Sequence, residues 1–342
     1  MTDVAAPRSA HESDSLPRKW LYVLATTNPP AGHVDLVSKW LVLTRAGVVP
    51  MTLVAAAVAG LLAEYRGSEV RWAFFALSAL GLVLAHVANN LMNDLFDLEV
   101  GTDTEDYPRN LYSPHPVLSG MITKRGLAVS ALTVNAACLA IMVYLTVERG
   151  WPVVAFALGG FALSAAYTAP PLRLKKRGLG EPTVVAVWGP LMVGGTYYAA
   201  TGTIPGAVAL ASLPYAVLCT TVLMGKHIDK LPWDAPKGIR TLPVRLGEAR
   251  ARRVTQGMFV AFYALVIALV GARVLPVATL LVVLSLPRLR PVWRAFDEPK
   301  PEVSPVPNPV WPLWFAPHAF LLTRRAGGLL VLGLVVGAVF GW

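Results

Sequence analysis

Residues 89–103 read NNLMNDLFDLEVGTD, and they continue an apolar run that begins near Ala73. A helix places residues three and four positions apart on one face. Four polar side chains have this spacing and form one stripe: His86, Asn90, Asn93 and Asp97. Asp94 lies beside the stripe, and Asp103 follows just after it. The polar atoms at the end of this apolar helix are therefore expected to face one place.

Two interpretations of this stretch are open. A carboxylate within a membrane costs roughly 2.5 to 3.5 kcal/mol on insertion scales, so an ionisable residue at such depth indicates a functional site. Alternatively, Asp94 and Asp97 form only a solvated helix end that leads into a polar loop. The rest of the chain decides between these two interpretations.

The composition indicates an integral membrane protein. The chain has 342 residues, of which 55% are hydrophobic and 15% are charged, and its mean hydropathy is +0.55. These values are too apolar for an ordinary soluble domain. The polar first twenty residues lack the apolar core of a signal peptide. The two cysteines, Cys138 and Cys219, lie in apolar runs without metal-ligand spacing, and we expect both to be buried core thiols.

Apolar runs of about 20 residues, enough to cross about 30 Å of hydrocarbon, recur along the chain. We place them at residues 41–62, 73–93, 127–147, 151–167, 182–200, 207–223, 257–274, 275–286 and 327–342. The sequence thus predicts an all-α polytopic membrane bundle of about nine transmembrane helices within residues 37–342. Residues 1–36 are predicted to be a polar N-terminal cytoplasmic tail.

The positions of the basic residues predict the orientation, because cytoplasmic loops carry the excess of Lys and Arg. With the N-terminus inside, 26 of the 30 Lys and Arg residues lie on the inner side and only four lie outside. The predicted location is therefore the cell (plasma) membrane, with the N-terminus and the polar loops cytoplasmic. The net charge of +10 does not indicate a nucleic-acid partner, because the basic residues lie between apolar segments.

A second acidic cluster lies in another predicted inner loop, KHIDKLPWDAPKGIRTLPVRLG at residues 226–247. Asp229 and Asp234 stand there among Lys and Arg residues. Mg²⁺ is usually held by one or two carboxylates together with substrate phosphates, and neighbouring Lys and Arg suit the remaining phosphate charge. Two acidic clusters on one side of the membrane therefore favour a metal-bridged diphosphate over a bare cation site.

Four segments resemble the intramembrane aromatic prenyltransferases of the UbiA superfamily, most of all the menaquinone branch, the 1,4-dihydroxy-2-naphthoate polyprenyltransferases. Residues 93–103 are similar to the family's first aspartate-rich motif, including its Gly-x-Asp ending. The other segments are Arg109 with HPVLSG at 115–120, the stretch 167–198 that begins YTAPPLRLKKRGLGE, and GIRTLPVRLG at 238–247. The resemblance covers roughly residues 40 to 280.

The second motif departs from the family pattern. The family has two aspartates with three residues between them, whereas four residues lie between Asp229 and Asp234. Lys230 occupies the position where counting back from Asp234 expects the first acid. A bend at Pro232 would restore the geometry. Asp234 is therefore the firmer assignment and Asp229 the provisional one.

The resemblance implies a bundle with a central cavity, open to lipid and to the cytoplasmic side, where Mg²⁺ and a polyprenyl diphosphate bind. The implied metal ligands are Asn93, Asp97 and Asp234, with Asp94, Asp103 and Asp229 as nearby or second-metal ligands. The implied catalytic residues are Asp94, Asp97, Asp234 and Arg109. The implied substrate-binding residues are Asn90, Lys175, Lys176, Arg240, Tyr167, Tyr197 and Tyr198. The aromatic faces that would stabilise an allylic cation are those of Phe96 and the three tyrosines.

The expected reaction is transfer of the polyprenyl group to a small aromatic or quinone-precursor acceptor within the bilayer. Two alternatives stay open. A related enzyme could ionise the same diphosphate and then cyclise the chain, or transfer it to a non-aromatic acceptor. A transporter would use such charges as an ion pathway, but transporters tend to place charge near the midplane of the membrane, whereas here it lies at one edge.

Overall fold

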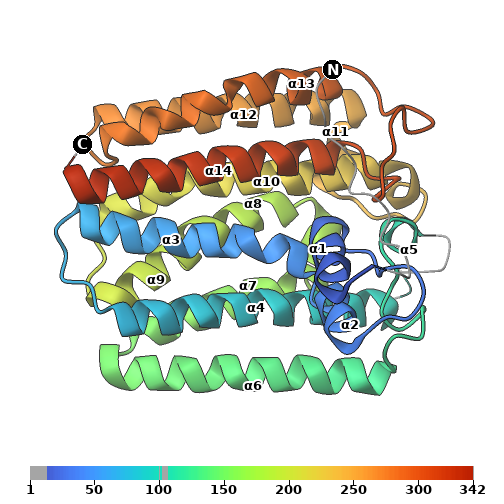
Figure 1. Cartoon of the computed structure of the whole chain (residues 1–342), viewed down its shortest axis with the longest axis horizontal. Coiled ribbons are helices and arrows are strands. Elements are labelled where there is room, and N and C mark those ends of the chain that lie inside the picture. Colours follow the sequence, from blue (N-terminus) through green and yellow to red (C-terminus); the bar gives the residue numbers. More distant parts are fainter. Residues whose placement is uncertain (1–13, 100, 102–106, 342) are drawn as a thin grey trace.

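The computed structural model describes residues 14–99, 101 and 107–341, and in these residues all regular secondary structure is helical. Asp103, a predicted metal ligand, lies outside the described residues. The long helices run side by side (Figure 1). They are α3 (Val49–Tyr65), α4 (Trp72–Glu99), α6 (Lys124–Arg149), α7 (Pro152–Thr168), α10 (Gly206–Asp234), α12 (Glu248–Gly271) and α14 (Phe315–Phe340).

The predicted membrane bundle is confirmed, but the count of nine spans is not. Six helices of the described chain are long and apolar enough to cross a membrane: α3 with the turn before it, α4, α6, α10, α12 and α14. The helix α7 is apolar but has only 17 residues. Two further stretches are composite: α8 (Gly180–Ala186), η3 (Val187–Leu191) and α9 (Met192–Thr201) follow without a gap, as do η4 (Val277–Ser285) and α13 (Leu286–Asp297).

Two of the predicted span boundaries are wrong. Arg45 adopts a left-handed conformation (φ 52°) after α2 (Leu36–Leu43), so the chain turns through η1 (Ala46–Val48) and the first long helix begins only at Val49. The last helix begins at Phe315 rather than near residue 327, because Arg324 and Arg325 lie exposed on α14 instead of ending it. Long arginine side chains can extend along a helix toward the membrane surface.

Part of the predicted N-terminal tail is folded. Helix α1 (Leu16–Thr26) packs against α2 and η1. Trp20 Nε1 donates a hydrogen bond to Asp35 Oδ1 at 3.1 Å, and the same carboxylate caps α2 by accepting the amides of Val37 and Ser38. An N-cap aspartate of this kind satisfies amide groups that have no partner within the helix. These contacts hold α1 and α2 together, and Ser113 Oγ donates to the carbonyl of Thr27 at 2.8 Å, which joins this segment to the residues after α5.

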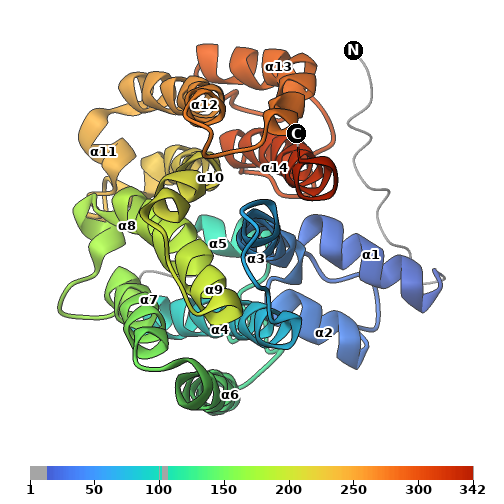
Figure 2. The same ribbon diagram turned by 90° about the vertical axis from the view of Figure 1, so that its left-hand side faces the viewer.

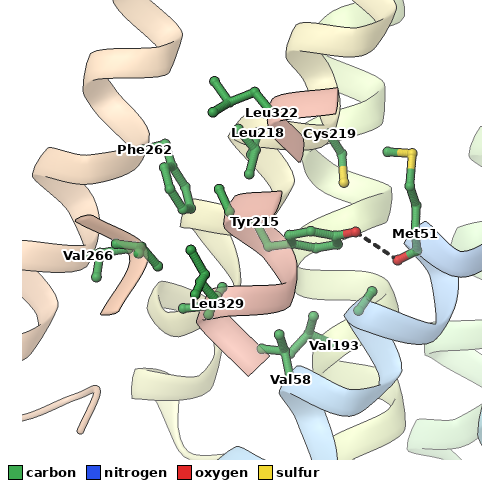
Figure 3. Packing of buried hydrophobic residues seen from close by; sticks show 14 of the residues in the cluster. Met51, Val58, Val193, Tyr215, Leu218, Cys219, Phe262, Val266, Leu322 and Leu329 are labelled. Atoms are coloured by element: carbon green, nitrogen blue, oxygen red, sulfur yellow. Dashed lines mark hydrogen bonds between the residues drawn. The ribbon is translucent and has the colours of Figure 1, made fainter. Parts of the chain in front are cut away.

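Helix α10 lies at the centre of the main hydrophobic core. The hydroxyl of Tyr215 donates a hydrogen bond to the carbonyl of Met51 at 3.0 Å, which joins α10 to α3 (Figure 3). Leu218 of α10, Phe262 of α12 and Leu322 and Leu329 of α14 pack in the same core. Cys219 is buried in this core, as predicted. A buried tyrosine hydroxyl needs such a partner, since an unsatisfied polar group costs about 1–3 kcal/mol.

The bundle has two different ends. Helices α1, α2, α5 (Pro108–Tyr112) and α11 (Leu242–Leu246) gather at one end, and the C-terminal end of α14 lies at the other (Figure 1). The view along the helices shows α12, α13 and α14 grouped on one side, while α4, α6, α7 and α9 are grouped on the other (Figure 2). The second group of helices encloses the cavity described below.

Candidate active site

A cavity of about 400 Å³ lies among α4, α6, α7, the α8–α9 stretch and α10. We call one part of it the polar end, which is lined by Arg45, Asn90, Asn93, Asp97, Arg109, Tyr112, Lys175, Lys226 and Lys230. The remainder, the apolar part, is lined by residues such as Leu82, Ile141, Leu145, Val153, Phe156 and Leu191. One continuous cavity therefore combines a charged end with an apolar part.

The cavity extends along most of the bundle. On α4 alone, its lining residues run from Ser78 to Asp97, and at 1.5 Å per residue this distance is about 28 Å. Leu145, near the end of α6, and Val153, at the start of α7, line it far from the polar end. Cys138 also lines the apolar part and is only half-buried, so the prediction that both cysteines are core thiols is wrong for this residue.

The predicted stripe on α4 faces the cavity. All four of its members line the cavity wall: His86, Asn90, Asn93 and Asp97. The amide of Asn90 donates to the carbonyl of Thr44 at 3.1 Å, so this residue also anchors the turn before α3. The hydroxyl of Thr168, at the end of α7, donates to Asn93 Oδ1. These bonds hold the polar side chains of α4 in place against neighbouring segments.

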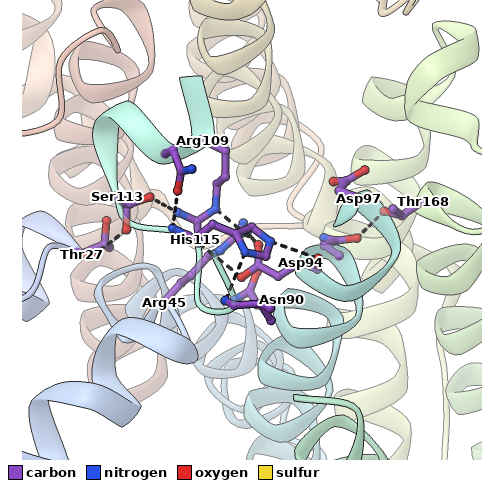
Figure 4. A network of polar contacts seen from close by, with 12 residues as sticks. Thr27, Arg45, Asn90, Asp94, Asp97, Arg109, Ser113, His115 and Thr168 are labelled. Atoms are coloured by element: carbon purple, nitrogen blue, oxygen red, sulfur yellow. Dashed lines mark hydrogen bonds and ion pairs between the residues drawn. The ribbon is translucent and has the colours of Figure 1, made fainter. Parts of the chain in front are cut away.

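Asp94 lies behind the cavity wall rather than on it. Its side chain is fully buried and forms ion pairs with Arg45 and with Arg109, whose Nε and Nη2 atoms each lie 3.3 Å from a carboxylate oxygen (Figure 4). Both arginines line the cavity. Arg109 Nη1 also donates to the carbonyl of Ser113 at 2.5 Å. The predicted catalytic acid Asp94 is therefore placed to position two cationic side chains, while Arg109 reaches the polar end as expected.

Asp97 faces the cavity directly. Its Oδ2 atom forms an ion pair with Lys175 Nζ at 2.5 Å, whereas its Oδ1 atom is buried and has no hydrogen-bond partner within the described chain. A buried carboxylate oxygen normally accepts a hydrogen bond. Asp97 Oδ1 lacks such a partner in the described chain and lies beside the cavity, so it is placed to bind a ligand there. Lys175 comes from η2 (Leu174–Arg177), in the turn between α7 and α8, and its ammonium group also lies 5.8 Å from the ring centre of Tyr167.

The acids of the second cluster do not line the cavity. Both carboxylate oxygens of Asp229 accept backbone amides of α14, from Phe315 at 3.0 Å and from Ala316 at 2.9 Å. Asp229 therefore caps another helix and does not line the cavity, so the provisional metal role does not fit its surroundings. Asp234 is also buried behind the cavity wall, where it accepts a hydrogen bond from the hydroxyl of Tyr107.

The remaining acids support at most a sparse metal site. Within the residues that the structure describes, no group of three or more His, Cys, Asp or Glu side chains could hold a metal ion. In the described part of α4, the carboxamide and carboxylate side chains that line the cavity are those of Asn89, Asn90, Asn93 and Asp97. Mg²⁺ often uses only one or two carboxylates and takes its other oxygens from water and substrate phosphates. The unpartnered Oδ1 of Asp97 fits a metal of this kind that arrives with its substrate.

Two of the three predicted tyrosines lie away from the cavity. Tyr167 lines it. Tyr197 is fully buried in the main core and its hydroxyl bonds to Ser68 Oγ at 2.8 Å, at the opposite end of the bundle. The hydroxyl of Tyr198 donates to the carbonyl of Arg149 at 2.6 Å. Neither of them lines the cavity, and neither does Phe96. Tyr197 and Tyr198 lie near the end of α9, which is far from the polar end, whereas Phe96 lies on α4.

Lys176 and Arg240 also lie outside the cavity lining. The amide of Arg240 donates to the carbonyl of Lys176 at 3.1 Å, so the turn before α8 and the segment before α11 are joined through their backbones. The side chain of Arg240 is exposed. Lys175 is the residue of this turn that lines the polar end in the described chain, and diphosphate contacts by Lys176 and Arg240 stay a prediction.

Four residues of the polar end were not among the predicted site residues: Arg45, Tyr112, Lys226 and Lys230. The two lysines had a visible signal, since Leu223, Lys226, His227 and Lys230 repeat at helical spacing and all line the cavity. Arg45, in the turn after α2, and Tyr112, at the end of the short helix α5, had none, because tertiary contacts bring both segments to the cavity. Burial raises the pKa of the Tyr112 hydroxyl, but the positive charges of Lys226 and Arg109, reinforced by Lys230 and Arg45, lower that pKa below its usual value.

Comparisons with known proteins agree with this arrangement. A sequence profile of the UbiA prenyltransferase family matches residues 52–305. The chain is 27% identical over 259 residues to the 2-carboxy-1,4-naphthoquinone phytyltransferase of Synechocystis sp., covering 74% of this chain and 80% of that protein. It is 30% identical to the 1,4-dihydroxy-2-naphthoate octaprenyltransferase of Escherichia coli, covering 65% and 72%. It is 28% identical to the digeranylgeranylglyceryl phosphate synthase of Natronomonas pharaonis, covering 61% and 68%.

Solved structures share the fold. A UbiA homolog from Aeropyrum pernix, solved without ligand, superposes with a TM-score of 0.63 at 20% sequence identity, covering 84% of this chain and 98% of the other. A UbiA homolog from Archaeoglobus fulgidus bound to GPP and Mg²⁺ gives a TM-score of 0.52 at 18% identity, covering 85% and 99%. At these identities the match establishes the architecture of the bundle.

Proposed function

Because the chain belongs to the UbiA prenyltransferase family, and so is a multi-pass membrane prenyltransferase, we propose that it transfers a polyprenyl group from an allylic diphosphate to an aromatic quinone precursor. The observation that carries this proposal is the continuous cavity, in which a charged end opens into an apolar channel. A prenyl diphosphate has the same two parts, a multiply charged head and a long hydrocarbon tail. Ligand sites of this kind fix orientation with few polar groups.

The polar end binds and activates the head group. Arg109, held by Asp94, and Lys175, held by Asp97, line this end and would contact the diphosphate oxygens. When the bond between the allylic carbon and the diphosphate oxygen breaks, both electrons leave with that oxygen. Fixed cationic side chains stabilise the charge that develops there. Since the two carboxylates hold these cations before substrate arrives, little reorganisation is needed during the reaction.

Mg²⁺ fits the same end. Asp97, through its unpartnered Oδ1, and Asn93 are the residues that would hold it together with diphosphate oxygens. The bound ion would act as a Lewis acid that neutralises the leaving group. The Archaeoglobus homolog bound to GPP and Mg²⁺ supports this assignment through its shared fold.

The allylic cation then reacts with the acceptor. Tyr167 presents its ring to the cavity beside the polar end, where an aromatic face can stabilise a cation and exclude water. A carbon of the acceptor ring attacks the allylic carbon, a carbon–carbon bond forms, and the same ring carbon loses its proton to restore aromaticity. The relatives named for naphthoate and naphthoquinone substrates support an acceptor of this type.

The test uses purified full-length protein in lipid nanodiscs with Mg²⁺ and a radiolabelled prenyl diphosphate. We expect a prenylated product with 1,4-dihydroxy-2-naphthoate and none without acceptor. A terpene alcohol or hydrocarbon formed without acceptor would instead show a cyclase. Product formed only with a glyceryl phosphate would show the non-aromatic activity named for the Natronomonas relative. Either result would overturn the proposed acceptor.

A further inference from the structure

Two lysines of the polar end have no part in the steps above. Lys226 and Lys230 lie one turn apart on α10, and both line the cavity. Neither forms an ion pair with a carboxylate in the described part of the chain. Their nearby partners are aromatic rings: Lys226 Nζ lies 6.0 Å from the ring centre of Tyr112, and Lys230 Nζ lies 4.4 Å from that of Tyr107. Lys175 and Arg109, by contrast, are each paired with an aspartate.

These lysines leave the polar end with an excess of positive charge. Five cationic side chains line it: Arg45, Arg109, Lys175, Lys226 and Lys230. Against them, the described residues supply Asp97 on the wall and Asp94 and Asp234 behind it, so the cationic side chains outnumber these carboxylates. Charges taken out of water are unfavourable unless they are paired. A multiply charged anion is the ligand that would satisfy this end of the cavity.

The two acids of the second cluster on α10, Asp229 and Asp234, do not line the cavity. Asp229 caps α14, and Asp234 accepts the hydroxyl of Tyr107 behind the wall. The cavity face of α10 carries Lys226 and Lys230 in the place where a second metal would need carboxylates. An ammonium group donates charge-assisted hydrogen bonds to phosphate oxygens, so it can supply locally the neutralisation that a metal ion would supply.

Resting on the proposed function, we propose that Lys226 and Lys230 bind the diphosphate directly and replace a second metal ion, so that one Mg²⁺ at Asn93 and Asp97 is sufficient. The α4 side of the polar end then contributes the metal ligands, and the α10 side contributes ammonium groups. The diphosphate lies between these two sides. Its affinity therefore depends only weakly on Mg²⁺.

The test measures binding, not turnover. Geranylgeranyl thiolodiphosphate, whose carbon–sulfur bond resists ionisation, is titrated calorimetrically into the full-length protein in nanodiscs, once with Mg²⁺ and once with EDTA. We expect binding in EDTA within about tenfold of the affinity with Mg²⁺, and one Mg²⁺ per bound analogue. Each charge-assisted hydrogen bond is worth roughly 10- to 100-fold in affinity, so Lys226→Gln and Lys230→Gln should each weaken binding in EDTA by that factor.

Two further variants separate binding from folding. Lys230→Arg keeps the charge and should retain most of the affinity in EDTA, which a purely structural role would not explain. Lys124→Gln removes a lysine that is exposed at the start of α6 and paired with Glu99 at 3.1 Å, so it should leave binding unchanged. Wild-type binding that requires Mg²⁺, or binding in EDTA that ignores both lysine substitutions, overturns this inference and leaves the prenyltransferase proposal intact. Failure to bind the analogue under either condition overturns both.

Discussion

Asp94 and Asp97 are only three residues apart, but their side chains have different surroundings and different predicted roles. Both belong to one helix and one short motif, yet Asp94 is fully buried against Arg45 and Arg109, while Asp97 faces the cavity with one oxygen that has no partner among the described residues. Removing a partner from a buried ion pair leaves an uncompensated charge, whereas a residue at a cavity is poised for a ligand. Substitutions at the two positions should therefore have different effects.

Asp97→Asn is expected to remove turnover without unfolding the protein. The amide cannot offer the anionic oxygen that Mg²⁺ prefers, and metal neutralisation of a leaving group is worth several kcal/mol, so kcat should fall by at least about 100-fold. Thermal unfolding in detergent should change less than for Asp94→Asn, because the asparagine oxygen can still accept a hydrogen bond from Lys175 and, within the described chain, the other carboxylate oxygen has no partner to lose. Normal turnover in this variant would contradict the assignment of Asp97 as a metal ligand.

Asp94→Asn is expected to act first on stability. It leaves two arginines beside a neutral side chain in a fully buried position, and breaking such a pair costs roughly 3 to 5 kcal/mol. Denaturant titration in mixed micelles should show this loss. A variant as stable as the wild type would instead mean that water reaches the two guanidinium groups. Asp97→Asn serves as the matched comparison on the same helix.

The contact between helices α10 and α14 explains why Asp229 does not lie at the predicted metal site. A Cβ at Gly225 would lie 2.7 Å from the amide nitrogen of Ala316, so the glycine allows the start of α14 to approach α10 at backbone distance. Asp229 stands one turn further along the same face and accepts the first amides of that helix. Helix N-termini carry unsatisfied amides and a partial positive charge, which favour a carboxylate. No local pattern in the sequence indicates this pairing of distant helices.

Asp229→Ala should therefore weaken the fold and leave metal dependence unchanged. Loss of a capping carboxylate typically costs about 0.5–2 kcal/mol, and here two buried amides lose their acceptor. The Mg²⁺ concentration for half-maximal activity should match that of the wild type. A large increase in that concentration would restore Asp229 as a metal ligand and would contradict the cap.

The apolar part of the cavity makes a prediction about tail length. Gly160 of α7 lines the cavity, and no atom lies within 4 Å of a Cβ added there. It stands seven residues before Tyr167, about 10 Å along the helix. Gly160→Leu should fold normally, since Gly is a poor helix former, and should shift preference toward shorter prenyl diphosphates in competition assays. Gly328→Leu, at a glycine of α14 that has the same free space but lies outside the cavity lining, is the control and should not change this preference.

At the scale of the whole molecule, the sequence predicted the architecture better than the site. Hydrophobic runs place most of the helices, and the spacing of His86, Asn90, Asn93 and Asp97 identifies one wall of the cavity. The remaining site depends on tertiary contacts. Arg45 reaches the polar end from the turn after α2 and Tyr112 from the short helix α5, whereas Tyr197 and Tyr198 lie on α9 at the opposite end. Motif resemblance alone cannot distinguish such positions.

Four arginines were predicted to lie on the outer side of the membrane, and their positions in the structure are consistent with this orientation. Arg66, Arg71, Arg149 and Arg273 all lie in or beside the turns at the end opposite the polar end of the cavity. Loops at the polar end carry most of the remaining basic residues. Because cytoplasmic loops are enriched in Lys and Arg, we propose that the polar end faces the cytoplasm, where a soluble diphosphate head group is supplied.

Cysteine labelling tests this orientation. In a background with Cys138→Ala and Cys219→Ala, single cysteines are placed at two exposed positions, Ala235 beside the polar end and Thr203 between α9 and α10. A membrane-impermeant maleimide added to intact spheroplasts should label Thr203→Cys, whereas Ala235→Cys should react only after the membrane is opened. The reverse pattern would place the polar end outside, where the excess of basic residues contradicts the charge rule. Retained prenyltransferase activity in both variants would show that labelling reports on the folded protein.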